Sequence, residues 1–292
     1  MRNRLILLVS MLITLSLLAA CGNASVENNH AAGHEGHGEK KNTDNKGEDE
    51  DHSGHVADQK LSNNDIQAAF TFEKGGAKAE EVTELTIKIT EKDGEPVNNF
   101  EINHEKLLHL IIVNHDLSFF NHIHPEFQGE GEFIIETTFP AGGEYKVFAD
   151  FIPSGGSNET LSEWVEVEGE EGEHTDIIAD SSFIKEVNGK EIELTLSGVK
   201  PKEDITLSYN IRDAKTKEGI NNLEPYLGAV GHVVILSADA ESYLHVHPLD
   251  EKASGPVAEF ATTFPQSGTY KIWGQFQHNG EIITVPFVVD VK

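Results

Sequence analysis

Sulfur is nearly absent from this chain of 292 residues. It has one cysteine, Cys21, and two methionines, Met1 and Met11. A single cysteine excludes an intrachain disulfide bond. Because no thiol or thioether follows position 21, a metal site built on sulfur is excluded from the rest of the chain. Histidine is the strongest metal ligand that remains there.

Basic residues are also scarce, with 22 Lys and Arg against 50 Asp and Glu. This balance argues against nucleic acid as a partner, because phosphate backbones are bound by clusters of Lys and Arg. It argues equally against electrostatic attachment to anionic lipid. A large acidic excess is typical of a well-solvated protein that attracts cations weakly and without specificity.

A long apolar run lies only at the N-terminus, where two arginines precede the apolar residues 5–18 and the lipobox-like "LAAC" of residues 18–21. This pattern predicts a lipoprotein export signal over residues 1–20, with Cys21 as the lipidated first residue of the mature chain. The alternatives are a plain signal peptide and an N-terminal membrane helix, for which the run is short. We expect acyl chains to hold the protein on the extracytoplasmic face of the cell membrane.

Residues 21–62 contain almost no large apolar side chain and are rich in Gly, Asn, Asp, Glu and Lys. Such a segment cannot bury enough surface to offset its chain entropy, so we expect a disordered tether between the lipid and the folded body. Its histidines lie among carboxylates in "HAAGHEGH" and "DHSGH", a composition that indicates accessory capture of divalent ions; a solubilising tail is the alternative. They are His30, His34, His37, His52 and His55.

From about residue 66 the chain consists of short apolar or alternating runs bounded by Gly, Pro, Asn and Asp, and no stretch sustains a helical period. Runs of this kind, rich in Val, Ile, Thr, Phe and Tyr, predict β-strands. The expected strands are 84–90, 106–113, 132–139, 144–151, 163–169, 190–198, 204–213, 231–237, 259–264, 269–276 and 281–291. The sequence therefore predicts an all-β body.

The body contains an internal duplication. Residues 98–125 align without a gap on residues 221–248, so that "HIHP" matches "HVHP". After a two-residue insertion, "TTFPAGGEYKVFADF" (137–151) matches "TTFPQSGTYKIWGQF" (262–276). Each unit has the length and strand number of a domain, which indicates two similar domains and not a solenoid.

We therefore predict two tandem immunoglobulin-like β-sandwich domains, over residues 63–170 and 175–292, after the signal and the His-rich tether. The Gly-x-Tyr segments at Tyr145 and Tyr270 are typical of a tyrosine corner, in which the tyrosine hydroxyl hydrogen-bonds a nearby backbone group.

Three histidines in each repeat surround the turn of an expected β-hairpin, in "HLIIVNHDLSFFNHIHP" (109–125) and "HVVILSADAESYLHVHP" (232–248). Alternate residues of a strand share a face. A register that pairs His109 with His124, or with His122, brings the three imidazoles together, whereas a one-residue slip scatters them. The predicted metal ligands are His109, His122, His124, His232, His245 and His247. The alternative is core histidines bonded to backbone carbonyls.

Three imidazole nitrogens leave a fourth coordination position for water, a carboxylate or a partner's ligand. Glu101 and Glu224 hold equivalent positions in the two repeats and are candidates for it, or for orienting an imidazole; the alternative is a solvent-facing turn residue. The remaining histidines of the body are His104, His115, His174 and His278. The first two have no counterpart in the second repeat and are treated as accessory; the last two are treated as incidental.

Imidazole-rich sites without sulfur favour Cu(II), Zn(II) or Ni(II), and copper has the highest intrinsic affinity. The pattern His-x-His-Pro, Thr-Thr-Phe-Pro and Gly-x-Tyr-Lys, over most of 80–170 and 190–291, resembles the YtkA/FixH-like immunoglobulin-type domains secreted by Gram-positive bacteria. The "DHSGH" of the tether is similar to His-rich segments of exported copper-resistance proteins. These resemblances imply an extracytoplasmic, metal-linked role. The methionines of many exported copper carriers are absent, which argues against Cu(I).

Together these features predict a membrane-anchored protein, not an enzyme, that binds Cu(II) or Zn(II) and buffers the ion or passes it to a membrane metal transporter. One alternative is a surface interaction or adhesion module whose histidines are structural, since immunoglobulin-type folds often serve such roles. Another is a zinc hydrolase with a metal-bound hydroxide, which would need a general base that no motif indicates.

Overall fold

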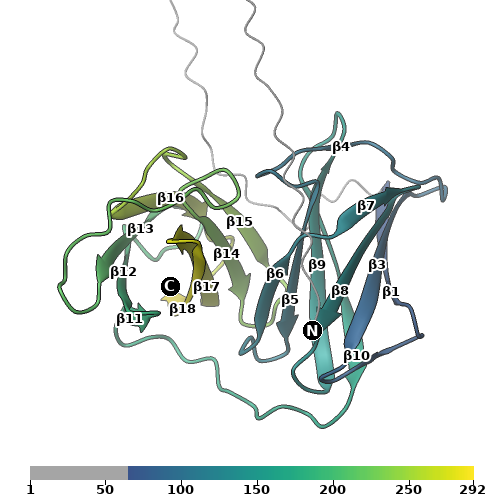
Figure 1. The fold of residues 1–292 in the computed structure, drawn as a ribbon, viewed down its shortest axis with the longest axis horizontal. Helices are drawn as coiled ribbons and strands as arrows, with labels where there is room; N and C mark the ends of the chain where they lie inside the picture. Colours follow the sequence, from purple (N-terminus) through teal and green to yellow (C-terminus); the bar gives the residue numbers. More distant parts are fainter. Residues whose placement is uncertain (1–64) are drawn as a thin grey trace, which may run out of the picture. The chain divides into compact units, whose positions relative to one another are not determined.

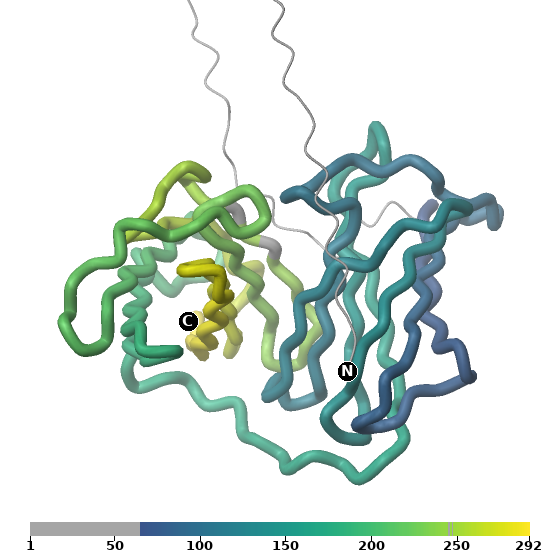
Figure 2. The backbone as a smooth tube through the Cα atoms, in the orientation of Figure 1, coloured from purple at the N-terminus to yellow at the C-terminus, as the bar shows by residue number. Residues whose placement is uncertain are grey.

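The computed structural model describes residues 65–292, except for the side chains of His245 and His247. The predicted export signal, Cys21 and the histidines of the predicted tether lie outside the described residues. The described part of the chain forms strands joined by turns and loops (Figures 1 and 2). In this part, no helix is long and apolar enough to cross a membrane. The prediction of an all-β body with two tandem immunoglobulin-like domains is confirmed.

Each run that was predicted as a strand overlaps a strand of the structure. The strands of the first repeat are β1 (Ile66–Phe72), β2 (Ala77–Lys78), β3 (Val82–Glu91), β4 (Phe100–Glu101), β5 (Leu108–Asn114), β6 (Phe120–Ile123), β7 (Glu126–Gly129), β8 (Glu132–Thr138), β9 (Gly143–Pro153) and β10 (Glu159–Glu168). Those of the second are β11 (Ile184–Val187), β12 (Lys190–Leu196), β13 (Asp204–Asp213), β14 (His232–Ser237), β15 (Tyr243–Pro248), β16 (Val257–Thr263), β17 (Gly268–His278) and β18 (Glu281–Val291).

The first repeat is built from two sheets, with strand orders β1-β3-β8-β7 and β2-β10-β9-β5-β6. Strand β3 shows the reason for two layers. Its residues alternate, so that Leu85, Ile87 and Ile89 are fully buried while their neighbours are partly exposed. One apolar face per sheet has to be covered, and the two sheets cover each other.

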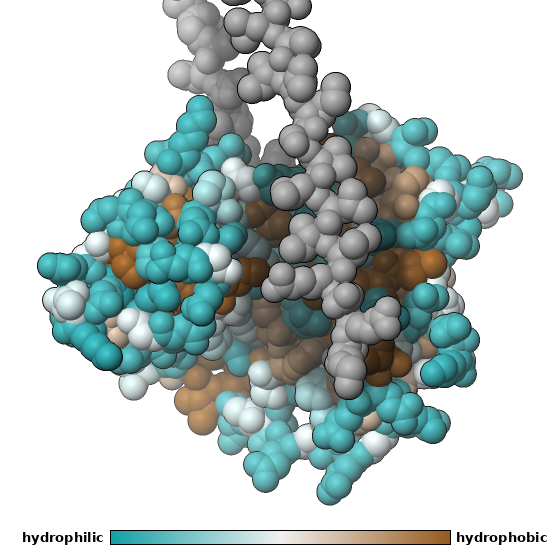
Figure 3. All heavy atoms as spheres, viewed as in Figure 1, coloured by the Kyte–Doolittle hydropathy of each residue, from teal (hydrophilic) through white to brown (hydrophobic). Residues whose placement is uncertain are grey.

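The second repeat has one continuous strand order, β11-β12-β13-β16-β15-β14-β17-β18. Strand β15 joins what would otherwise be two sheets, because it pairs with β14 through Val246 and with β16 through His247. The core is rich in aromatic rings: Tyr209 packs edge-on against Phe260 and Phe276. Hydrophilic residues predominate over the loops of this repeat in Figure 3, as the acidic composition leads one to expect.

Both tyrosine corners are present. The Tyr145 hydroxyl donates to the Ala141 carbonyl, and the Tyr270 hydroxyl donates to the Gln266 carbonyl, each at 2.9 Å. In both repeats the acceptor lies four residues before the tyrosine, at the entry to the long strand β9 or β17. The prediction from the Gly-x-Tyr segments is confirmed.

Residues 65–292 belong to one compact unit of the chain, and an apolar cluster joins the two repeats. Strand β5 is buried on both faces: Leu108, Leu110 and Ile112 belong to the core of the first repeat, whereas Ile111 and Val113 belong to the joining cluster. The second repeat contributes its own residues from β14, β15, β17 and the turn between β14 and β15 to that cluster: Val234, Leu236, Ala240, Tyr243 and Trp273.

The contacts across this cluster are reciprocal. Phe120 stacks on Trp273 with ring centroids 4.5 Å apart, and Phe148 stacks on Tyr243 at 5.3 Å. In the repeat alignment Phe120 corresponds to Tyr243, and Phe148 corresponds to Trp273. Each repeat therefore uses the same two positions to contact the other, as the subunits of a two-fold symmetric dimer do.

Candidate metal centre

Strand register decides whether the histidines meet. In the β5–β6 hairpin Ile111 pairs with His122 and Leu110 with Ile123. Extended by one residue, this is the predicted register in which His109 lies opposite His124. The second repeat has the same register, with Val234 paired with His245. The register prediction is therefore confirmed in both repeats.

The three predicted histidines of the first repeat lie together. The Nδ1 atom of His109 is 3.0 Å from Nε2 of His122 and 3.2 Å from Nε2 of His124. His109 is fully buried and His122 is 9% exposed, so water has little access to the nitrogens between them. The structure thus brings this trio onto one face, as the register requires.

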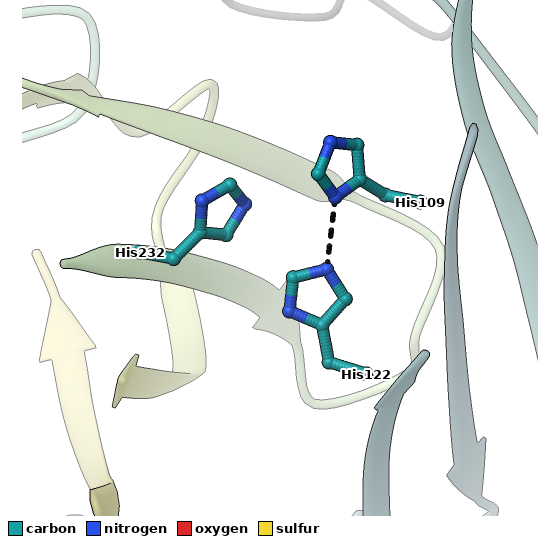
Figure 4. Close-up of side chains that lie close together, drawn as sticks. All are labelled: His109, His122 and His232. Atoms are coloured by element: carbon teal, nitrogen blue, oxygen red, sulfur yellow. Dashed lines mark hydrogen bonds between the residues drawn. The ribbon is translucent and has the colours of Figure 1, made fainter. Parts of the chain in front are cut away.

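His232, which the sequence assigned to a separate trio in the second repeat, lies in the same cluster. Its ring is stacked on His109 with centroids 5.2 Å apart and is 4.9 Å from the ring of His122. One ring nitrogen from each of the three residues lies within 4.8 Å of the others, and all three side chains are buried. Figure 4 shows the rings turned toward one another. Among the described side chains, one cluster therefore draws on both repeats.

Hydrogen bonds on the outer side of two rings fix their tautomers. The Nε2 atom of His109 is 2.9 Å from the carbonyl oxygen of Asn103, which can only accept, so this nitrogen carries the hydrogen. The Nδ1 atom of His122 donates to Oε1 of Gln275 at 2.7 Å. The inner nitrogens, Nδ1 of His109 and Nε2 of His122, lie at hydrogen-bonding distance from each other, as the dashed line in Figure 4 marks. When both rings are neutral, the outer hydrogen bonds make each inner nitrogen an acceptor. Outer hydrogen bonds of this kind orient metal-binding histidines.

His124 is available as a neutral base. Burial, followed by electrostatic interaction with His109 and Lys106, lowers the pKa of His124 from 6.5 to about 3. Its lone pair is consequently not lost to a proton near neutral pH. Since metal ions bind only deprotonated imidazole, such a site does not have to release protons on binding.

A tight turn positions the first outer acceptor. Asn103 and Lys106 exchange two backbone hydrogen bonds, and His104 and Glu105 between them have φ angles of 46° and 65°. This turn directs the Asn103 carbonyl at His109 and places the ring of His104 5.1 Å from that of His232. His104, predicted as accessory to the first repeat, thus adjoins a residue of the second.

The other candidates lie away from the cluster. Glu101 accepts hydrogen bonds from Ser154 and Gly155, and Glu224 accepts one from Gly280, all in exposed positions. Glu101 ends strand β4 and Glu224 forms an isolated β-bridge with Gln277, and neither carboxylate belongs to the histidine cluster. Elsewhere, the exposed histidines are engaged locally: His115 packs on Trp164 and His174 lies near Asp116.

Three residues of the site were not found from the sequence. Asn103 and Gln275 bond the outer nitrogens of His109 and His122, and Asp150 on β9 lies opposite His109 on β5. Asn103 acts through its backbone carbonyl, which every residue has, so its residue type gives no signal. Gln275 could have been found, because the alignment of 137–151 on 262–276 sets it against Asp150 within otherwise apolar strands. A polar side chain at a buried strand position signals a partner across the fold.

A family model described as a domain of unknown function (DUF8832) matches residues 62–169 and again residues 185–292. The two matches together span well over half of the chain, so the chain belongs to this family and contains its domain twice. No curated protein matches the chain. The resemblance to YtkA/FixH-like domains stays a prediction.

The solved structures that match this chain are distant in sequence. The adhesin FdeC of Escherichia coli is 16% identical over 77% of this chain and 64% of its own length, with a TM-score of 0.26. Invasin, a bacterial integrin-binding protein, is 13% identical over 76% of this chain and 39% of its own, with a TM-score of 0.23. The fibronectin(III)-like modules of CbhA from Clostridium thermocellum are 13% identical over 76% and 92%, with a TM-score of 0.22. This chain spans less than two thirds of the adhesin and of invasin.

Proposed function

We propose that this two-repeat member of the family binds a transition-metal ion, Cu(II) or Zn(II), at the histidine cluster shared by its repeats. The observation that supports the proposal best is the 3.0 Å separation of His109 Nδ1 and His122 Nε2, two nitrogens whose outer hydrogen bonds leave lone pairs on both. Two lone pairs at this distance repel unless a proton or a metal cation lies between them. In a buried site the protonated imidazole is penalised by desolvation.

The separations of His109 Nδ1 from His122 Nε2 and from His124 Nε2 suit coordination to one ion. Imidazole nitrogens bind Zn(II) at about 2.0–2.1 Å. At that length, nitrogens 3.0 and 3.2 Å apart subtend angles of roughly 95–105° at a common ion, near the tetrahedral range. The same neutral nitrogen donors suit Cu(II), which has the higher intrinsic affinity. His109, His122 and His124 are the proposed ligands from the first repeat, and His232 is the proposed ligand from the second.

The biological role follows from location. We propose that the lipid on Cys21 holds the protein at the extracytoplasmic face of the membrane and that the tether histidines gather ions near the body. A buried cluster of neutral imidazoles then holds an ion more tightly than the tether does. Such a protein would buffer the metal or deliver it to a membrane transporter.

The decisive experiment is a calorimetric titration of the full mature chain with Zn(II) and Cu(II), in which the five tether histidines are changed to Asn to remove weak sites. Tight binding is expected at the body. The double variant His109→Ala, His122→Ala should lose it, because both inner nitrogens are removed. His115→Ala, which changes an exposed histidine outside the cluster, is the matched control and should bind as the parent does. Unchanged tight binding in the double variant would refute the proposal.

Thermal unfolding of the same chains with and without metal decides between this function and the second candidate, a surface interaction module. That class includes the adhesin and the invasin named above. It predicts that neither metal shifts the melting temperature of the chain and that the histidines act only through the carbonyl and amide contacts already described. A metal-induced rise in melting temperature that His115→Ala retains and the double variant lacks would exclude it.

A further inference from the structure

A buried carboxylate adjoins the cluster. Asp150, on β9, is fully buried and lies directly opposite His109 on β5, so the two side chains share a face with Cβ atoms about 5 Å apart. Asn158 and Thr160 donate to its Oδ1 at 2.7 and 3.3 Å, and the Tyr243 hydroxyl of the second repeat donates to its Oδ2 at 3.3 Å. These donors satisfy the buried carboxylate oxygens of Asp150.

The duplication assigns this position a role. Asp150 corresponds to Gln275 in the repeat alignment, and each lies opposite the first histidine of its repeat, His109 or His232. In the second repeat the side-chain oxygen of Gln275 orients a metal-facing ring, that of His122. The two positions are thus equivalent places beside the cluster, one with a neutral amide and one with a carboxylate.

The difference in charge matters because the site is buried. Neutral imidazoles bring no charge, so a divalent ion would place two uncompensated positive charges where water has little access, at a large desolvation cost. A carboxylate held beside the ligands offsets that cost by Coulomb attraction, which is stronger in the protein interior than in water. The attraction is proportional to the charge of the ion.

We propose that Asp150 is the charge-balancing residue of the metal centre and makes it selective for divalent over monovalent cations. This inference rests on the proposed metal binding. It assigns Asp150 a positioning and electrostatic role beside the ligands. It also predicts that this one side chain sets the selectivity of the site for divalent over monovalent cations.

The test is Asp150→Asn in the full mature chain with the tether histidines changed to Asn. The substitution keeps the shape and removes the charge. Affinity for Zn(II) and Cu(II) should fall about 10- to 100-fold, the range found when outer residues of metal sites are changed. Affinity for Ag(I), the monovalent probe, should fall only by about the square root of that factor, because the ion carries half the charge. Equal losses for Zn(II) and Ag(I), or no loss, would overturn the proposal.

Gln275→Glu provides the matched gain of charge at the equivalent position. It should raise the affinity for Zn(II) more than that for Ag(I), and the double variant Asp150→Asn, Gln275→Glu should recover most of the Zn(II) affinity. If Asp150→Asn alone does not fold, as judged by circular dichroism, Gln275→Glu decides: an unchanged ratio of Zn(II) to Ag(I) affinity overturns the inference. A parent chain that binds neither ion would instead refute the proposed function itself.

Discussion

The turn before the first histidine differs between the repeats although its backbone is the same. Repeat 1 has His104 and Glu105 there, with φ angles of 46° and 65°, and repeat 2 has Leu227 and Gly228, with φ angles of 54° and 78°. Glycine is the residue that adopts such angles at least cost. Repeat 1 keeps a glutamate in the unfavourable region and a histidine beside the cluster. Repeat 1 thus has two non-glycine residues at positive φ in this turn, and repeat 2 has one, Leu227.

A second difference lies at the start of the central strand. Leu108 of repeat 1 is a core residue, whereas the corresponding residue of repeat 2 is Gly231. A Cβ atom at Gly231 would lie 2.6 Å from the ring of Phe276 and 2.7 Å from the carbonyl oxygen of Gln275. The absence of a side chain at Gly231 leaves room for the Phe276 ring and the Gln275 carbonyl. The pairing of the first histidine with the equivalent position of the long strand is the same in both repeats. The central strands of the two repeats thus present similar faces, although the residues packed at their starts differ.

The reciprocal aromatic pairs allow the largest test of this similarity. Phe148→Ala and Trp273→Ala each remove one large buried ring at equivalent positions, and each should lower the free energy of unfolding by about 3–5 kcal/mol. Denaturant unfolding of the chelator-treated protein measures both. Ile282→Ala, at a half-exposed position, is the control and should change stability by less than about 0.5 kcal/mol. A large loss in only one of the two variants would contradict the two-fold description.

The equivalent aspartates Asp116 and Asp239 should differ. Burial alone would raise both pKa values, but hydrogen bonds lower them below 3.8: Asp116 accepts from the backbone of Ser118 and Thr175, and Asp239 accepts from Ser237 and Glu241. Asp116 is buried and also accepts a hydrogen bond from the backbone of Thr175, in the segment between the two repeats. Asp116→Ala should therefore cost about 2 kcal/mol and Asp239→Ala about 1 kcal/mol.

The pH dependence provides a check on these aspartates. Because their folded-state pKa values are lowered, their contribution is present above pH 3.8 and is lost as the pH falls below it. The difference in unfolding free energy between the parent and each variant should shrink on acidification through this range. A difference that is independent of pH would show that the carboxylate charge plays no part.

The tyrosine corners should give the smallest and most equal effects. Tyr145→Phe and Tyr270→Phe each remove one hydroxyl hydrogen bond to a backbone carbonyl, which contributes about 1 kcal/mol. Thermal unfolding of the two variants should give similar decreases in melting temperature. If one decrease is several times the other, the two corners are not equivalent in energy, and the repeats differ more than their geometry suggests.

Much of the fold could be predicted from the sequence because strands with one buried face alternate, as β3 and β13 do. Strands β1, β2, β4, β7 and β11 were not among the predicted strands. Of these, β2 and β4 have two residues each, and two residues carry no period. Of the site, the register of His109 with His124 was among the predicted possibilities, and the structure selected it. The contact of His232 with the first repeat was not predicted, because an alignment of repeats says which residues are equivalent and not which ones touch.

Taken alone, the sequence determined that sulfur cannot serve as a ligand in the body, that the body consists of β-strands, and that it is a duplication with three histidines in each half. These are properties of residue type and of spacing along one chain, where the period of a strand is fixed by its covalent geometry. Only the tertiary structure decided that His109, His122 and His232 share one buried cluster and that Gln275 and Asp150 lie beside it. Those contacts depend on how two apolar faces far apart in sequence pack together. The hydrophobic effect that drives this packing is non-directional, so the sequence pattern shows which faces are apolar and not which of them meet.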